Sequence, residues 1–281
     1  MRAIFVSCMC AAIAVAQAPE KIKVLTYNVQ FLPGVAAAQN KRPNPEYRAK
    51  RIAEEAGTFD IVGLQETFEI RHRTAIKDGV KAAWNGTLNS IESPKPDGFL
   101  TNGGCLLLTR MPIVASDAIV YKHFSTPKEY GFRADGFAAK GAIWARIARS
   151  DSAKNDFIDV FVTHLEARAD EMRPFQYQEL AEFIKAKSDP TRPMLLLGDL
   201  NTRGMAELRK DPASPYSTMM KAFGDARGIT DTWVALMDDA LGGTNEQESA
   251  EVGARIDYIL LGNPKPPAMQ LKSVRIQVNT Y

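Results

Sequence analysis

The chain of 281 residues is poor in cysteine and histidine, with three of each. Cys8 and Cys10 lie in an apolar stretch near the N-terminus, so a chain that begins after that stretch keeps only Cys105. A small scaffold held together by disulfides is therefore excluded. The same scarcity disfavours a structural zinc site, which is built from four cysteine or histidine ligands.

The sequence also has no linker rich in proline, glycine or serine, no internal repeat and no low-complexity segment. Because its composition does not change along the chain, one large domain is favoured over two small ones. A basic stripe is absent too, since 35 Lys and Arg are interspersed with 33 Asp and Glu, for a formal net charge of +2. A protein that binds duplex nucleic acid is expected to carry a basic surface, so this pattern argues against that class.

The N-terminus has the pattern of a secretory signal peptide. Arg2 provides the positive start, residues 3–15 are apolar, and residues 16–18 form an A-x-A cleavage site. We expect residues 1–18 to be removed, residues 19–281 to form one domain, and the protein to be secreted or periplasmic. An uncleaved anchor is the alternative, although the apolar stretch is too short to span a bilayer as a permanent helix.

Polar side chains recur at the ends of apolar runs that have the character of strands. They are Asn28 in residues 21–30, Glu66 in 59–67, His164 in 157–166, Asp199 and Asn201 in 193–201, and Asp257 in 255–261. Each alone is compatible with an ordinary turn or surface residue. Together they indicate a site, because α/β proteins place their chemistry at the carboxyl ends of strands.

The residue types in this set favour a hard cation. Carboxylate and amide oxygens suit Mg²⁺, which takes one or two carboxylates and keeps several waters. Between the strands, helices are predicted over residues 45–57 and 173–187, and from Ser214 and Pro215 onwards, since apolar residues recur there with helical spacing. Alternating strands and helices indicate an α/β fold.

Five motifs, TYNVQ, LQE, THLEA, GDLN and RIDYI, follow one another over residues 26–261. Their order resembles the endonuclease/exonuclease/phosphatase superfamily of metal-dependent phosphodiesterases, which includes DNase I-like nucleases and neutral sphingomyelinases. Residues 103–113 and 134–143 are most similar to the secreted bacterial sphingomyelinase branch. The resemblance implies a four-layer α/β/β/α sandwich, the DNase I-like fold, with residues 19–281 as the catalytic domain.

The resemblance also implies roles for single residues. Glu66 would be the main Mg²⁺ ligand with Asn28 close to the metal, and Mn²⁺ is a possible substitute. His164 would contact the scissile phosphate, Asp199 would orient the attacking water, and Asn201 would hydrogen-bond the phosphate. The remaining two assignments are Asp257, which would orient a catalytic histidine, and Lys140, which would either approach the substrate or simply be an exposed lysine at a strand end.

The superfamily's last motif, Ser-Asp-His, has no counterpart before Tyr281. His72 lies in a basic stretch interpreted as an exposed helix face, and His123 lies in a loop, so neither matches that motif. We therefore expect the last strand of the fold to be missing. Truncation of a longer natural chain is favoured over a natural form with weak or no activity, because the other motif positions are intact.

The resulting hypothesis is a secreted Mg²⁺-dependent phosphodiesterase that hydrolyses sphingomyelin or a related phospholipid and releases a phosphorylated head group. An endonuclease or general phosphodiesterase with a nucleic-acid substrate is one alternative. A non-catalytic binding protein that lacks the general-base histidine is another. The sphingomyelinase branch touches membranes with an aromatic hairpin. Tyr281 is the single aromatic residue after Tyr258, so the sequence shows no such hairpin, and this argues against binding at a membrane surface. The sequence indicates no protein partner.

Overall fold

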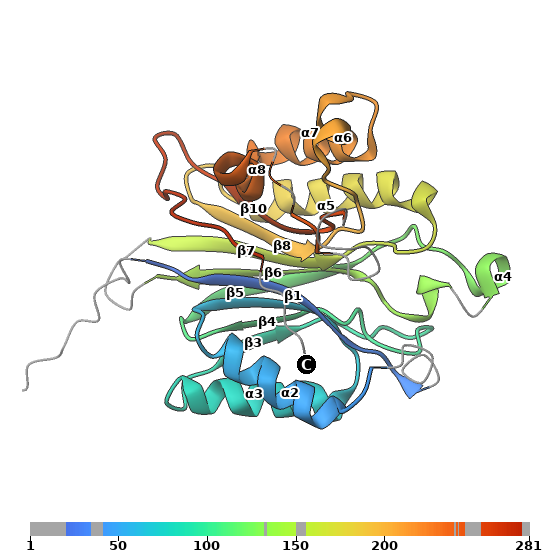
Figure 1. Cartoon of the computed structure of the whole chain (residues 1–281), viewed down its shortest axis with the longest axis vertical. Coiled ribbons are helices and arrows are strands. Elements are labelled where there is room, and N and C mark those ends of the chain that lie inside the picture. The colour runs from blue at the N-terminus through green and yellow to red at the C-terminus, as the bar shows by residue number, and fades with distance from the viewer. Residues whose placement is uncertain are drawn as a thin grey trace, which may run out of the picture.

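The computed structural model describes residues 21–34, 42–131, 134–149, 156–238, 240, 242–244 and 254–276. The expected signal peptide, residues 1–18, lies outside the described residues. Two sheets pack face to face, with helices on both outer faces (Figure 1). This arrangement confirms the predicted four-layer α/β/β/α sandwich.

The first sheet has four strands in the order β1-β2-β4-β3. They are β1 (Val24–Phe31), β2 (Ile61–Thr67), β3 (Asn89–Glu92) and β4 (Leu106–Thr109). β1 and β2 are parallel, and the other pairs are antiparallel. The helices α2 (Pro45–Ala56) and α3 (Ile70–Ala83) cover its outer face (Figure 1).

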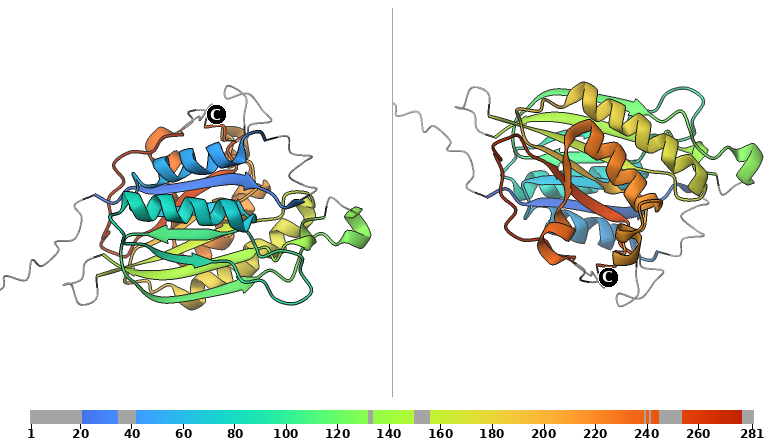
Figure 2. Two further views of the ribbon diagram at one scale, coloured as in Figure 1. Left: turned by 90° about the horizontal axis from the view of Figure 1, so that it is seen from below. Right: turned by 90° about the horizontal axis from the view of Figure 1, so that it is seen from above.

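The second sheet has six strands in the order β5-β6-β7-β8-β10-β9. They are β5 (Ile113–Val120), β6 (Gly141–Ala148), β7 (Phe157–His164), β8 (Met194–Asp199), β9 (Ile229–Asp231) and β10 (Asp257–Gly262). β7 and β8 are parallel, and β10 is antiparallel to β8. The helices α5 (Arg173–Lys187) and α7 (Pro215–Arg227) cover this sheet, as the right-hand view of Figure 2 shows.

Three short helices, α4 (Pro127–Tyr130), α6 (Ala206–Lys210) and α8 (Thr232–Met237), lie in the connections. Two single 3₁₀ turns span Asp135–Phe137 and Asp170–Met172. No helix of the described residues is both long and apolar enough to cross a membrane.

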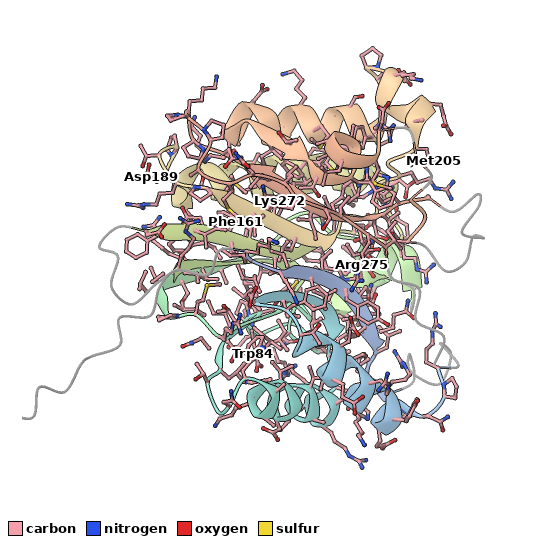
Figure 3. The ribbon with its side chains drawn as sticks, turned by 60° about the vertical axis from the view of Figure 1, so that its left-hand side comes forward. Trp84, Phe161, Asp189, Met205, Lys272 and Arg275 are labelled. Atoms are coloured by element: carbon pink, nitrogen blue, oxygen red, sulfur yellow. The ribbon has the colours of Figure 1, made fainter. Side chains whose placement is uncertain are left out.

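The hydrophobic core forms three layers, which explains why the central strands are apolar on both faces. Val160 and Val162 of β7 pack between the sheets, whereas Phe161 points outward into the layer beneath α5 and α7. Trp84, at the end of α3, belongs to the layer on the other side of the molecule. Figure 3 labels Trp84 and Phe161 in these two separate layers.

Local signals fix the helix ends. The Ser214 hydroxyl accepts a hydrogen bond from the Ser217 N–H at 3.1 Å, so α7 begins where Ser214 and Pro215 predicted. The helix continues through Gly224 and ends at Gly228, whose φ of 66° is the left-handed conformation that glycine adopts easily.

One interpretation of the sequence was wrong. In the basic stretch at the start of α3, the Arg71 side chain is exposed, but the His72 side chain is only 14% exposed. Its ring stacks on Phe31 with 4.8 Å between centroids. His72 therefore packs α3 against β1 and is not part of a solvated face.

β1 forms one edge of the four-stranded sheet in the described part of the chain. β10, in contrast, lies between β8 and β9 in the second sheet. The expectation that a last strand is missing stays a prediction.

Candidate active site

The strand directions bring the predicted residues together from both sheets. Asn28 lies in β1 and Glu66 near the end of β2, while His164 and Asp199 are the last residues of β7 and β8. Asp257 begins β10 directly opposite Asp199, because β10 runs antiparallel to β8. Four strand ends and one strand start therefore meet at one end of the sandwich.

Asn28 connects the two sheets at this point. Its Nδ2 donates to Glu66 Oε1 and to Asp199 Oδ2, both at 2.9 Å. The His164 Nε2 lies 3.9 Å from each of the same two oxygen atoms. Asn28, Glu66, His164 and Asp199 therefore form one compact cluster, as the strand-end pattern predicted.

Glu66 and Asn201 are held in unusual backbone conformations. Their φ angles are 56° and 46°, in the left-handed region that non-glycine residues seldom occupy. Such conformations cost about 1–3 kcal/mol each and are concentrated at functional sites. Here they turn the chain at the ends of β2 and β8, where the polar side chains emerge.

Asn201 lies beside the cluster and contacts its neighbours through both backbone and side chain. Its N–H donates to Asp199 Oδ1 at 3.0 Å, and its Nδ2 donates to the Leu165 carbonyl oxygen at 3.1 Å. These bonds fix the Asp199 carboxylate in orientation, since its other oxygen accepts from Asn28. Asn201 thus connects the loop after β8 to the end of β7.

The three acidic groups of the site are destabilised in their charged forms. Burial raises the pKa of the Glu66 and Asp199 carboxyls. The pKa of Asp257 is raised well above its ordinary value by burial and then by the charges of Asp199 and Glu66. Asp257 Oδ1 is also buried without a hydrogen-bond partner among the described residues.

Lys140 is buried in the site and is not an exposed lysine at a strand end. Its Nζ donates to Asp135 Oδ2 at 2.6 Å and to the Leu165 carbonyl oxygen at 3.0 Å, and lies 3.3 Å from His164 Nε2. Burial alone would lower the pKa of Lys140, but the Asp135 carboxylate and nearby acids outweigh it and raise that pKa. Lys140 is therefore a fixed cation beside His164.

Burial and the charge of Lys140 together keep His164 neutral. Burial, followed by the Lys140 charge, holds the pKa of the imidazole well below its ordinary value, so His164 is neutral at pH 7. A protonated lysine has donors only, so His164 Nε2 accepts its hydrogen bond and Nδ1 carries the ring proton.

The donor set fits a divalent cation. Three buried carboxylates repel one another, and an added positive charge would stabilise their ionised forms. The described residues contain no group of three or more His, Cys, Asp or Glu side chains arranged to hold a metal by themselves. Mg²⁺ commonly binds through one or two carboxylates and retained waters, so Glu66 remains a suitable ligand. Asn28 would need its amide turned over, because its nitrogen now faces Glu66.

Sequence reasoning missed two residues next to this cluster, Asp135 and Glu166. Asp135 precedes Lys140 by five positions, and Glu166 follows His164 by two within the THLEA motif. The remaining histidine, His123, lies outside the cluster, where it stacks on Phe175 and pairs with Glu179. The available signals were that Asp135 lies within residues 134–143, already noted for their resemblance, and that Glu166 lies within THLEA.

Comparison with known proteins identifies the family and the fold. The Endonuclease/Exonuclease/phosphatase family matches residues 25–269. A sphingomyelinase C from Bacillus cereus is 27% identical over 270 residues, which cover 85% of this chain and 74% of that protein. A sphingomyelinase from Dictyostelium discoideum is 29% identical over 190 residues, or 55% of this chain, and the match spans only 39% of that protein.

Among solved structures, beta toxin from Staphylococcus aureus with bound magnesium ions has a TM-score of 0.63 at 18% identity. The match covers 86% of this chain and 83% of the toxin, and it shows a shared fold. The fold and the cluster at the strand ends define a phosphoesterase-like protein. The chain belongs to the Endonuclease/Exonuclease/phosphatase family.

Proposed function

We propose that this protein is a secreted or periplasmic, Mg²⁺-dependent phosphodiesterase that hydrolyses sphingomyelin or a related phospholipid to a lipid and a phosphorylated head group. The observation that carries the proposal is the cluster in which Asn28 links Glu66 to Asp199 beside His164. The similarity to B. cereus sphingomyelinase C over most of the chain supports the substrate class. In this proposal residues 1–18 are the signal peptide and residues 19–281 form the catalytic domain.

Each residue of the cluster has a separate role in the in-line attack of water on the phosphorus atom. Asp199, held by Asn28 and the Asn201 N–H, orients the attacking water and accepts a hydrogen bond from it. Asn201 provides a donor for the phosphate oxygens, on which negative charge increases in the transition state. The three donors of the Lys140 ammonium already bind Asp135, Leu165 and His164, so Lys140 contributes its positive charge beside the phosphate. His164 lies between Lys140 and the two carboxylates, next to the place of the same phosphate.

Glu66 would hold the metal, with Asn28 next to it. Mg²⁺ bound there would supply Lewis-acid stabilisation of the phosphate charge, and Mn²⁺ could replace it. Asp257, in register with Asp199, provides a second carboxylate behind the site. Its partnerless Oδ1 is an acceptor available to an imidazole or a water.

The test is release of phosphocholine from sphingomyelin in detergent micelles, with Mg²⁺ and with excess EDTA. We expect activity that EDTA abolishes and that Asp199→Asn lowers by a factor on the order of 10²–10⁴, the range for loss of a group that acts on the attacking nucleophile. Asp189→Asn changes a partly exposed aspartate that accepts from the Thr191 N–H at the turn before β8, at the other end of that strand from Asp199, and this matched control should keep full activity. Release that persists in EDTA would refute the metal requirement.

Two alternatives give different results in parallel assays. A nuclease or general phosphodiesterase would nick plasmid DNA or cleave a simple diester, with the same loss on Asp199→Asn, and leave sphingomyelin intact. A binding protein without catalysis would release no product from any of these substrates. The similarity to sphingomyelinase C favours the lipid substrate.

A further inference from the structure

Glu166 is a buried acid for which the proposed reaction has no use. The residue has no exposed surface, and it follows His164 by two positions. Its carboxylate accepts from four donors, of which the Ser125 hydroxyl is shared between the two carboxylate oxygens. The donors are the Ser125 N–H at 2.9 Å, the Ser125 hydroxyl at 3.0 and 3.1 Å, the Arg168 N–H at 3.1 Å and the Ala169 N–H at 3.3 Å. Burial raises the pKa of the Glu166 carboxyl, and these donors offset the cost of burying it.

Ser125 connects Glu166 to the segment that contains Asp135. The Ser125 hydroxyl donates to Glu166 and accepts from the Asp135 N–H at 2.8 Å. The Ser125 carbonyl oxygen accepts from the Gly136 N–H at 3.0 Å. A Cβ on Gly136 would lie only 2.5 Å from that oxygen, so the two segments are in the closest contact that the backbone allows. Glu166 therefore holds the backbone of Asp135 through the Ser125 side chain. The Asp135 carboxylate also lies close enough to Glu166 for its charge to raise the pKa of Glu166.

Asp135 in turn fixes Lys140. One carboxylate oxygen, Oδ2, accepts from Lys140 Nζ at 2.6 Å and from the Ala167 N–H at 2.7 Å. The other two hydrogen bonds of the Lys140 ammonium go to the Leu165 carbonyl oxygen and to His164 Nε2. These contacts therefore form a closed network that begins and ends on residues 164–167, at the end of β7 and directly after it.

We propose that Glu166 is a positioning residue that acts through Ser125 and Asp135 to hold the Lys140 ammonium against His164 Nε2. In this arrangement the ring proton of His164 stays on Nδ1, and Lys140 keeps its place beside the phosphate site. The proposal rests on the proposed function for its effect on rate, but the geometry of His164 can be tested without any activity.

The first test is the protonation pattern of His164 in protein labelled with ¹⁵N-histidine and kept in excess EDTA. Because the chain has only three histidines, His72, His123 and His164, each ring is resolved and can be assigned by substitution. We expect the Nδ1–H tautomer for His164 in the chain without substitutions. Glu166→Gln should convert His164 to a mixture of tautomers, because one amide oxygen cannot accept from all the donors that face the carboxylate.

The matched control is Asp159→Asn at the opposite end of β7. Asp159 is also fully buried, and it accepts from Arg146 and Trp144. Its loss should lower the melting temperature without changing the His164 spectrum. If Glu166→Gln leaves the tautomer unchanged, or if Asp159→Asn changes it equally, Glu166 is only a structural acid and the proposal is overturned. Should Glu166→Gln not fold, Ser125→Ala removes the same link and is expected to give the same spectral change.

The second test uses the rate of phosphodiester hydrolysis. Glu166→Gln should lower kcat by roughly 10–100-fold, the usual effect of losing a group that orients a site residue, with little change in KM. In a Lys140→Met background the same substitution should have almost no further effect, because groups that act through one another are not additive. Multiplicative losses would overturn the proposal. Absence of activity in the natural chain would refute the proposed function and leave the spectroscopic test to decide the role of Glu166.

Discussion

The buried ion pair between Arg255 and Asp231 should be among the interactions on which stability depends most. Arg255 Nη2 lies 2.6 Å from Asp231 Oδ2, and the side chains are only 4% and 3% exposed. Asp231 also accepts from the Tyr216 hydroxyl at 3.0 Å and from the Trp233 N–H at 3.1 Å. Arg255→Met keeps much of the side-chain volume and leaves the Asp231 carboxylate buried without its counter-charge.

Breaking a buried pair by removing one partner costs about 3–5 kcal/mol, and the lower end applies here because Asp231 keeps its other donors. A loss of about 3 kcal/mol corresponds to a fall in melting temperature of about 6–12 °C for a protein of this size. Thermal unfolding followed by circular dichroism measures it. We expect Asp231→Asn combined with Arg255→Met to lose less than the two single changes added together, since the double variant contains no unpaired buried charge.

The exposed pair of Lys221 and Asp225, one helical turn apart in α7, is the control. Both side chains are largely exposed, so Lys221→Met should cost no more than about 0.5 kcal/mol. Equal melting temperatures for Arg255→Met and Lys221→Met would refute the reasoning.

Three further predictions concern the site and the sheet beneath it. Mg²⁺ at about 100 times its dissociation constant should stabilise the unsubstituted chain by about 2.7 kcal/mol in thermal unfolding. Glu66→Gln should abolish this stabilisation, and Glu54→Gln, at an exposed position, should keep it. Equal stabilisation of both variants would exclude Glu66 as a ligand. In excess EDTA, the depressed pKa of His164 means that the unfolded chain binds its proton at about pH 6.5 while the folded chain does not, so stability is complete above that pH and falls as the pH falls. The natural chain should therefore lose about 1.4 kcal/mol more than His164→Asn between about pH 7.5 and pH 5.5, and parallel pH curves would show that the imidazole is not buried in its neutral form. Gly198→Ala would place a Cβ 2.3 Å from the Thr163 carbonyl oxygen and push β8 away from β7, so both the melting temperature and the activity should fall. In Gly224→Ala the new Cβ meets no atom within 4 Å, and the substitution should stabilise α7 by about 0.5–1 kcal/mol. An unchanged melting temperature in Gly198→Ala would contradict the close approach of the two strands.

The sequence by itself determined the fold class and most of the site. Apolar runs that end in Asn28, Glu66, His164 and Asp199 predicted strands whose carboxyl ends carry polar groups, and the structure places these four side chains together. This succeeded because strand period, helix spacing and capping residues are local properties that the chain expresses wherever it lies. The order of the motifs added the family, which the match over residues 25–269 confirms.

Only the tertiary structure decided which charges are buried and what pairs with them. Lys140 could be read equally well as an exposed lysine, and nothing near it in sequence showed that it lies between Asp135 and His164. Glu166 belonged to a quoted motif, yet its partner Ser125 is 41 positions away. His72 looked solvated because its neighbours in sequence are basic, but its stacking on Phe31 depends on how α3 packs against β1.

The physical reason is the same in each case. Burial, and with it the pKa of an ionisable group, depends on the packing of segments that are distant in sequence, because desolvation and charge pairing act through space. The sequence specifies which groups arrive at the strand ends. The packing of the two sheets against residues 121–131 and 134–140 decides which of those groups are charged, which are neutral and which hold the others in place.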